Sequence, residues 1–170
     1  MRAFFALEVP AQTREAIARW RLHAVPRLRR AVASENFHIT VHFLGNLQER
    51  HLDSVCAQVD TLRVEPFDLC LDTSGYFPGS GIFWIGPGVV ATALPALVKA
   101  LREVSRNSGL NTSHRAYHPH LTLFRNCRSR PPRPSPVPDF HIPCNGFTLF
   151  ESTTDPSGAH YTVLRRWHSA

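Results

Sequence analysis

Apolar and polar residues alternate along the chain at two spacings, which predict three helices and seven strands. Helical spacing recurs at about residues 11–23, 48–62 and 92–107. The second of these segments carries apolar side chains at i, i+3, i+4 and i+7, a pattern typical of an amphipathic helix. Its members are Leu52, Val55, Cys56 and Val59. The third segment repeats this pattern and meets a stop signal at Gly109.

Runs rich in β-branched and aromatic residues predict the strands. They cover about residues 3–9, 36–45, 67–76, 81–86, 118–125, 144–152 and 160–167. Turn-forming sequences at 77–80 and 155–158 join two neighbouring pairs into hairpins. The order of helices and strands fits neither a doubly wound α/β fold nor an all-β sandwich, and it favours an α+β fold with antiparallel sheets.

The segment 128–138 is rich in proline and arginine, a composition that disfavours the interior of either a helix or a strand. We expect an exposed, irregular loop there. A role as a proline-rich ligand for another protein is the alternative.

Two of the predicted strands carry the same short pattern, a histidine followed two residues later by a threonine. The copies are His38-Ile39-Thr40-Val41 and His120-Leu121-Thr122-Leu123. Successive side chains of a strand point to opposite faces, so each copy presents an imidazole and a hydroxyl on one face. Two aliphatic side chains are buried behind them. We expect the two strands to face each other across a cleft.

A pair of imidazoles suits phosphoryl chemistry, because one can take a proton from the attacking oxygen while the other gives one to the leaving oxygen. The ordinary pKa of histidine, about 6.5, makes both protonation states accessible near neutral pH. Threonine hydroxyls on the same face can donate hydrogen bonds to phosphate oxygens as charge develops. Neither motif contains a carboxylate, so we expect no metal and no cofactor.

The ten histidines of the chain leave a zinc site as an alternative. By strand alternation His38 and His42 share one face, as do His118 and His120. The threonines would have no role in such a site, and no cysteine or aspartate accompanies either pair at ligand spacing. We therefore prefer acid–base catalysis without a metal.

A net charge of +6 predicts attraction to polyanions. Lys99 is the only lysine, so the positive charge is almost all guanidinium, which suits contacts with phosphate. The cysteines show no Cys-x-x-Cys spacing, and no signal sequence or apolar stretch of about 20 residues occurs. We expect free thiols, no membrane association and a soluble, cytoplasmic protein. The chain shows no coiled-coil signal, which favours a monomer.

At the two motifs the chain resembles the 2H phosphoesterase superfamily, and within it the bacterial RNA 2′,3′-cyclic phosphodiesterase family, also called 2′-5′ RNA ligase. The resemblance extends to blocks outside the motifs and covers essentially the whole chain. The blocks are FFAL at 4–7, FHIT at 37–40 with FLG at 43–45, WIG at 84–86, HPHLTL at 118–123, FTL at 147–149 and RW at 166–167.

The resemblance implies a single domain over residues 1–170, built from two pseudo-symmetric lobes with two antiparallel sheets, outer helices and a central cleft. It also implies hydrolysis of an RNA 2′,3′-cyclic phosphate end to a 2′-phosphomonoester, with weak reverse ligation. His38 matches the proton donor to the 3′ leaving oxygen, and His120 matches the base that activates water. Thr40 and Thr122 match the phosphate-binding hydroxyls.

Four further residues are candidates for the cleft. Arg125 is a natural phosphate anchor, yet strict strand alternation places it opposite the second motif unless the strand ends or bulges there. Phe5 and Trp84 are candidates for stacking on a base, with core packing as the alternative. His42 shares the catalytic face by alternation and could tune His38 or line the cleft.

Two other functions stay open at the level of sequence. The first is a non-catalytic module that binds RNA ends through the motifs. The second is a phosphodiesterase for a small cyclic nucleotide such as ADP-ribose 1″,2″-cyclic phosphate. The motifs define the chemistry at phosphorus, whereas the walls of the cleft, which select the rest of the substrate, cannot be derived from one sequence.

Overall fold

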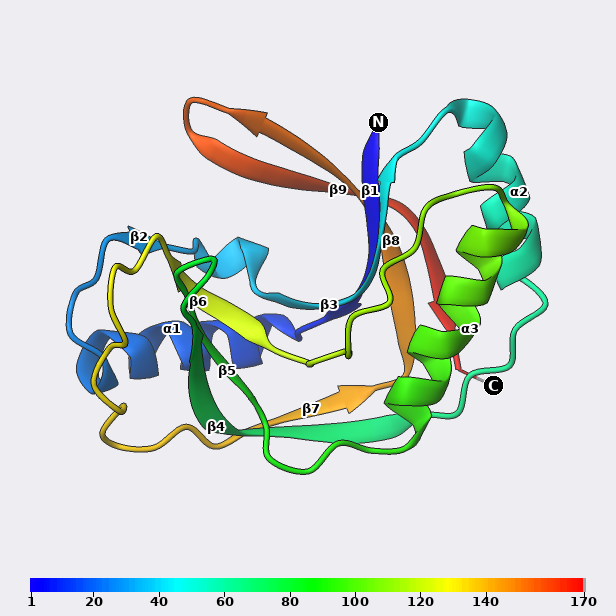
Figure 1. The fold of residues 1–170 in the computed structure, drawn as a ribbon. Coiled ribbons are helices and arrows are strands. Elements are labelled where there is room, and N and C mark those ends of the chain that lie inside the picture. The colour runs from blue at the N-terminus through cyan, green and yellow to red at the C-terminus, as the bar shows by residue number, and fades with distance from the viewer. Residues whose placement is uncertain (170) are drawn as a thin grey trace.

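The structure, a computed structural model, describes residues 1–169 and contains three α-helices in that range (Figure 1). They are α1 (Ala11–Ala24), α2 (Glu49–Val59) and α3 (Ala93–Asn107). All three were predicted, and α2 ends earlier than the sequence pattern indicates. A single 3-10 turn, η1 (Ser34–Asn36), precedes the first motif strand. No helix in the described part is long and apolar enough to cross a membrane.

The first sheet has four antiparallel strands in the order β3-β1-β8-β9. Their bounds are β1 (Arg2–Glu8), β3 (His38–Asn46), β8 (Gly146–Asp155) and β9 (Gly158–His168). Each overlaps one of the predicted strands, with ends that differ by one to three residues. The first motif lies in β3, which forms one edge of this sheet.

The second sheet has five antiparallel strands in the order β2-β6-β5-β4-β7. Their bounds are β2 (Arg30–Ala31), β4 (Phe67–Phe77), β5 (Ile82–Pro87), β6 (Leu121–Arg125) and β7 (Phe140–Cys144). The second motif lies at the start of β6. The sequence did not predict β2 or β7, because β2 has two residues and β7 contains a proline, which strands tolerate at the edge of a sheet.

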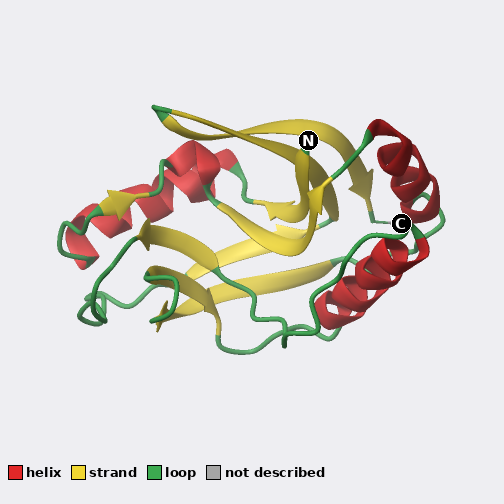
Figure 2. Ribbon diagram, turned by 45° about the horizontal axis from the view of Figure 1, so that its top comes forward, coloured by secondary structure: helices red, strands yellow, loops and turns green. Residues whose placement is uncertain are grey.

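The two sheets lie between the helices, with α1 at one end of the molecule and the α2–α3 pair at the other (Figure 2). One hydrophobic cluster draws residues from both sheets, and the aliphatic residues of both motifs are part of it. Ile39, Leu121 and Leu123 are fully buried, as the alternation of each motif predicted. The rigid core therefore lies directly behind the motif residues.

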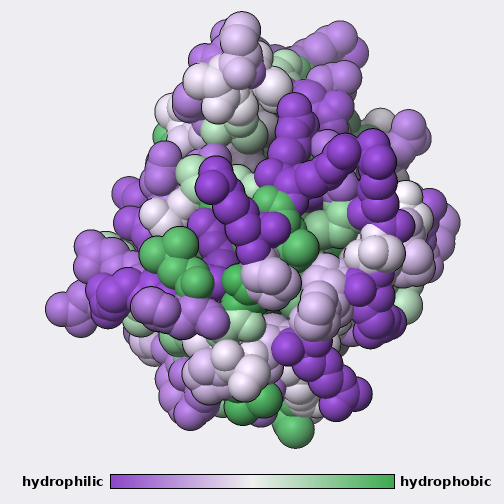
Figure 3. All heavy atoms as spheres, turned by 90° about the vertical axis from the view of Figure 1, so that its left-hand side faces the viewer, coloured by the Kyte–Doolittle hydropathy of each residue, from purple (hydrophilic) through white to green (hydrophobic). Residues whose placement is uncertain are grey.

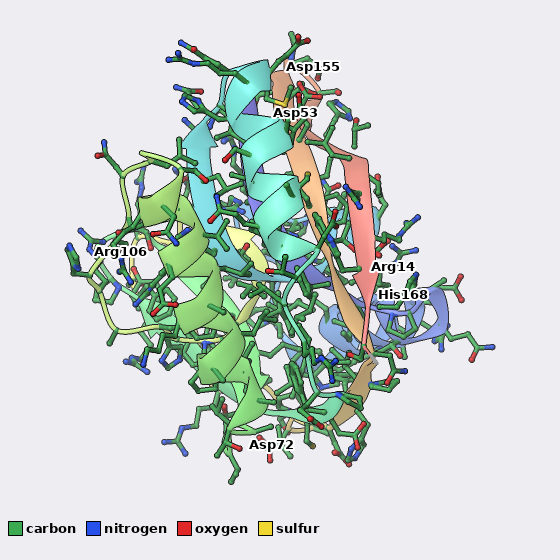
Figure 4. The ribbon with its side chains drawn as sticks, turned by 90° about the vertical axis from the view of Figure 1, so that its right-hand side faces the viewer. Arg14, Asp53, Asp72, Arg106, Asp155 and His168 are labelled. Atoms are coloured by element: carbon green, nitrogen blue, oxygen red, sulfur yellow. The ribbon has the colours of Figure 1, made fainter. Side chains whose placement is uncertain are left out.

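Helices α2 and α3 lie side by side on one side of the molecule (Figure 4). The apolar stripe of α3 is buried, and α3 also contacts β3. One face of the first motif strand is thus covered by α3.

The segment 128–138 forms no helix or strand, as predicted, but it is packed more closely than an exposed loop. Pro131, Pro134 and Pro138 are buried. The Trp20 indole of α1 donates a hydrogen bond of 2.8 Å to the carbonyl of Pro136. Proline side chains can be buried without an unpaired N–H, which explains how an irregular segment packs against α1.

Candidate active site

A cavity of about 270 Å³ lies between the two sheets and receives side chains from both. Both predicted motif pairs line it, one from β3 and one from β6. They are His38, Thr40, His120 and Thr122. The structure therefore brings together two segments that lie about 80 residues apart in the sequence.

His38 is held by hydrogen bonds at both ring nitrogens. Its Nδ1 lies 2.7 Å from the carbonyl oxygen of Asn36, and its Nε2 lies 3.0 Å from the hydroxyl of Thr40. A carbonyl oxygen only accepts, so Nδ1 carries a proton in the neutral ring. Nε2 then accepts the hydrogen bond of the Thr40 hydroxyl, and it is the nitrogen that can take up or release the second proton.

His120 repeats this arrangement in the other sheet. Its Nδ1 lies 2.8 Å from the carbonyl oxygen of His118, again two residues earlier in the chain. The same tautomer follows, with Nε2 available for proton transfer. Both motifs thus use the backbone just before the motif strand to orient the ring.

Aromatic rings enclose both imidazoles and lower their pKa by removing water. His38 packs at 5.1 Å from Phe4 and 5.0 Å from Tyr161, measured between ring centroids, and its burial lowers its pKa from 6.5 to about 4. Burial likewise lowers the pKa of His120, whose ring lies 5.0 Å from that of Phe77. The charge of Arg125 lowers both values further.

Strand β3 has an extra residue immediately after its motif threonine. Phe5 of β1 pairs with His42 and Ala6 pairs with Thr40, so Val41 is inserted as a β-bulge. The bulge reverses the alternation, and it places His42 on the opposite face from Thr40. The expectation that His42 shares the catalytic face is therefore wrong.

His42 is 5% exposed and packs against α3, where its Nε2 lies 2.7 Å from the hydroxyl of the buried Ser105. Phe43 takes the position in the cavity that strict alternation assigns to His42. Its ring is 65% exposed and lines the cavity. Sequence reasoning missed Phe43 because a bulge leaves no mark in a single strand.

Strand β6 has the same irregularity at the equivalent position. Trp84 of β5 pairs with Thr122 and Phe83 pairs with Phe124, so Leu123 is the inserted residue. The bulge turns Arg125 onto the cavity face, which it lines. The guanidinium of Arg21 and the backbone N–H of Val32 both donate to the Leu123 carbonyl, at 2.9 Å each, so the bulged backbone remains hydrogen-bonded. Phe43 and Arg125 thus occupy the same place in their motifs, three residues after the threonine.

The structure contradicts the candidates for base stacking. Phe5 is 0% exposed and packs against Phe147 and Trp167 in the core. Trp84 is also buried, with its ring 4.6 Å from that of His118. Neither ring has a free face for a base. In β1, strand alternation turns the neighbouring Phe4, rather than Phe5, toward the cavity.

The zinc alternative in the cleft loses one of its two pairs, since His38 and His42 lie on opposite faces of β3. Within residues 1–169, the one group of three side chains with metal-ligating atoms close together is found elsewhere. It consists of Cys70, Asp139 and His141.

Comparison with known proteins connects this geometry to a family. The family described as the 2′-5′ RNA ligase superfamily matches residues 9–137. An RNA 2′,3′-cyclic phosphodiesterase of Escherichia coli K12 is 34% identical over 167 residues, which cover 98% of this chain and 95% of that protein. A protein of the same description from Methanocaldococcus jannaschii is 30% identical, over 98% of this chain and all of its own length.

The crystal structure of E. coli LigT complexed with 3′-AMP superposes with a TM-score of 0.91 at 33% identity. The superposition covers 99% of this chain and 97% of LigT. It confirms the predicted α+β 2H phosphoesterase fold, with two antiparallel sheets and a cleft between them. Sequence, fold and the paired motifs agree, and the chain belongs to the 2′-5′ RNA ligase superfamily.

Proposed function

We propose that this protein hydrolyses RNA 2′,3′-cyclic phosphate ends to 2′-phosphomonoesters without a metal. The observation that carries the proposal is the matched tautomer of His38 and His120. Each ring donates Nδ1–H to a backbone carbonyl and keeps Nε2 for proton transfer in one shared cavity. Full-length relatives described as RNA 2′,3′-cyclic phosphodiesterases support the substrate.

In the reaction, His120 takes a proton from water as the water oxygen attacks phosphorus. The bond from phosphorus to the 3′ oxygen breaks, and His38 gives its Nε2 proton to that oxygen. The product carries a 2′-phosphate and a 3′-hydroxyl. The hydroxyls of Thr40 and Thr122 donate hydrogen bonds to the non-bridging oxygens, where negative charge increases in the transition state.

The acid role of His38 depends on the substrate itself. With a pKa of about 4, its imidazole is neutral in the free protein near pH 7. The negative charge of a bound cyclic phosphate raises the pKa of a nearby imidazole and favours the protonated form. Substrate binding therefore prepares the acid, while the base is already neutral.

The side chains three residues after each threonine are suited to hold the rest of the substrate. Arg125 offers a guanidinium to the phosphate, and Phe43 offers an exposed ring to the terminal base. The cavity of about 270 Å³ is small beside an RNA chain. Longer RNA must therefore continue over the surface.

The side of the molecule that carries α1 and β2 shows many strongly hydrophilic side chains with hydrophobic ones between them (Figure 3). Arg27, Arg29 and Arg30 are exposed in the segment leading into β2, and Arg30 pairs with Arg125 across the two strands. These guanidinium groups support binding of the RNA that precedes the terminal nucleotide.

The reverse reaction, in which a 5′-hydroxyl replaces water, would use the same residues and form a 2′-5′ linkage weakly. We also propose that the chain acts as one domain of two similar lobes, because one core cluster joins the sheets and both motifs bulge after the threonine. Four free thiols support a cytoplasmic location. The cavity is lined by residues of one chain, which supports a monomer.

The direct test is incubation of EDTA-treated protein with a short RNA that ends in a 2′,3′-cyclic phosphate, followed by chromatographic identification of the product isomer. We expect wild type to make the 2′-phosphate, and His38→Ala and His120→Ala each to lose about 10²–10⁴-fold in rate. An unchanged end with retained RNA binding would indicate a binding module, whereas turnover of ADP-ribose 1″,2″-cyclic phosphate alone would indicate a small-nucleotide enzyme.

A further inference from the structure

A cysteine, an aspartate and a histidine meet on the exposed face of the second sheet, outside the cleft. Cys70 of β4 pairs directly with His141 of the edge strand β7. Asp139 lies directly before β7, and its carboxylate reaches both of these side chains. None of the three lines the cavity that contains the motif histidines.

The spacing of the three donor atoms matches that of ligands on one tetrahedral ion. Cys70 Sγ lies 3.5 Å from Asp139 Oδ1 and 3.9 Å from His141 Nε2, and the latter two atoms are 3.4 Å apart. Zinc–ligand bonds of about 2.0–2.3 Å at tetrahedral angles separate sulfur from nitrogen or oxygen by about 3.5 Å, and nitrogen from oxygen by about 3.3 Å.

We propose that Cys70, Asp139 and His141 bind one Zn²⁺ ion, with a water molecule in the fourth position. Thiolate and imidazole donors select zinc over magnesium and calcium, which prefer oxygen ligands. Exposure of His141 and Asp139 leaves the fourth position open to solvent. On binding, the Cys70 thiol releases its proton to solvent and the neutral imidazole coordinates through Nε2.

The surroundings of the cluster supply negative charge in an otherwise basic protein. Burial raises the pKa of the Cys70 thiol, as do the hydrogen bond to Asp139 and, more weakly, the charge of Asp72 two residues after Cys70. One carboxylate oxygen of Asp72 accepts a hydrogen bond from the Gly88 N–H. Asp72 therefore adds charge beside the ion and is not counted as a ligand.

The position of the site gives it a structural consequence. Asp139 follows directly after the segment 128–138, and β7 is the edge strand of its sheet. A bound ion would link the end of this segment and the edge strand β7 to the interior strand β4. The Asp155–His160 pair at the β8–β9 turn serves as an internal comparison, because its atoms lie 3.0 Å apart but no thiol accompanies them. Asp155 and Asp72 lie at opposite ends of the molecule (Figure 4).

The test uses tag-free, reduced protein, stripped with EDTA and exchanged into chelator-free buffer, and Co²⁺ as a spectroscopic substitute for zinc. Wild type should bind one equivalent and develop a thiolate-to-cobalt charge-transfer band that Zn²⁺ abolishes. Cys70→Ser should lose the band, whereas Cys127→Ser, which alters another partly exposed thiol, should keep it. Removal of a residue that only orients a metal ligand weakens metal binding about 10–100-fold. His141 is proposed as a direct ligand, so His141→Ala should weaken cobalt binding at least roughly tenfold.

Thermal unfolding supplies a second readout that does not depend on the band. Zn²⁺ should raise the Tm of wild type and Cys127→Ser and leave that of Cys70→Ser unchanged, because an ion that binds only the folded state stabilises it. A band that persists in Cys70→Ser, or the absence of any saturable band in wild type, would overturn the proposal. RNA turnover should be equal in wild type and Cys70→Ser, so this test is independent of the catalytic one.

Discussion

At the scale of single residues, the proposed reaction depends on how the protein sets the protonation of two imidazoles. Backbone carbonyls fix Nδ1–H in both His38 and His120, and aromatic walls lower both pKa values. Both rings are neutral in the free protein near pH 7. His120 can therefore act as the proposed base directly, whereas His38 can act as the acid only after a bound anion has favoured its protonation.

This arrangement predicts different pH optima for free and substrate-bound protein. The profile of kcat/KM reports the free protein, so its optimum should lie below pH 6.5, where both histidines titrate. The profile of kcat reports the complex, where the phosphate raises both pKa values, so its optimum should shift to higher pH. Steady-state rates over a pH series check this, and coincident optima would contradict it.

Arg125 should contribute both to substrate binding and to the pKa of the histidines. A hydrogen bond to a charged group contributes about 1.5–3 kcal/mol, so Arg125→Ala should lower kcat/KM by about 10–100-fold. Because its positive charge lowers the pKa of His38 and His120, the variant's acidic limb should move to higher pH.

The matched control is Arg128→Ala, which removes an exposed guanidinium three residues further along and outside the cavity. It should retain the wild-type pH profile. Equal losses in the two variants would indicate a general charge effect instead of a contact at the phosphate.

At the scale of elements, the bulges in β3 and β6 decide which side chains reach the cleft. Each inserts one residue after the motif threonine, and the following side chains change faces. Phe43 and Arg125 enter the cavity as a result, and His42 is buried beneath α3. Two strands with the same motif thus place an aromatic ring, Phe43, and a cation, Arg125, in the same cavity.

The β4–β5 hairpin supports the second motif through a close approach of Trp84 to a glycine. A Cβ atom on Gly75 would overlap the Trp84 ring, which itself packs against His118. Gly75→Ala should therefore destabilise the protein by about 1–3 kcal/mol through overpacking, measured by urea unfolding. Gly79→Ala in the hairpin turn has no atom within 4 Å and should stay close to wild type. Equal stabilities would show that the hairpin relaxes freely.

At the scale of the whole molecule, buried histidines make folding stability depend on pH. Burial lowers the pKa of His42 from 6.5 to about 4, so the unfolded chain binds more protons between these values. Stability is then fully present above about pH 6.5 and is lost as pH falls toward 4. For this one residue the loss is on the order of 3 kcal/mol.

His42→Gln should flatten the dependence of unfolding free energy on pH over this window, measured by urea unfolding at several pH values. Ser105→Ala is the matched control, because it removes the 2.7 Å hydrogen-bond partner of His42 and keeps the titrating ring. It should lower stability and retain the slope. A wild-type slope in His42→Gln would assign the effect to other groups.

The sequence alone determined most of the helices and strands and the positions of the two motifs. The spacing of histidine and threonine in two strands predicted both pairs that line the cavity, since strand alternation over three residues is a local property. The three helices were predicted because their apolar stripes have clear helical periods. The resemblance to 2H phosphoesterases indicated the fold, which the comparisons confirmed.

Only the tertiary structure decided which further residues line the cavity. A bulge arises from the register between neighbouring strands, so the face on which His42, Phe43 and Arg125 lie cannot be derived from their own segment. The edge strand β7 likewise depends on a neighbouring strand, because it forms by pairing with β4 in spite of its proline. Pairing across strands also brings Cys70 to His141, 71 residues further along the chain. Local patterns thus specify what each strand carries, and partner strands specify where it points.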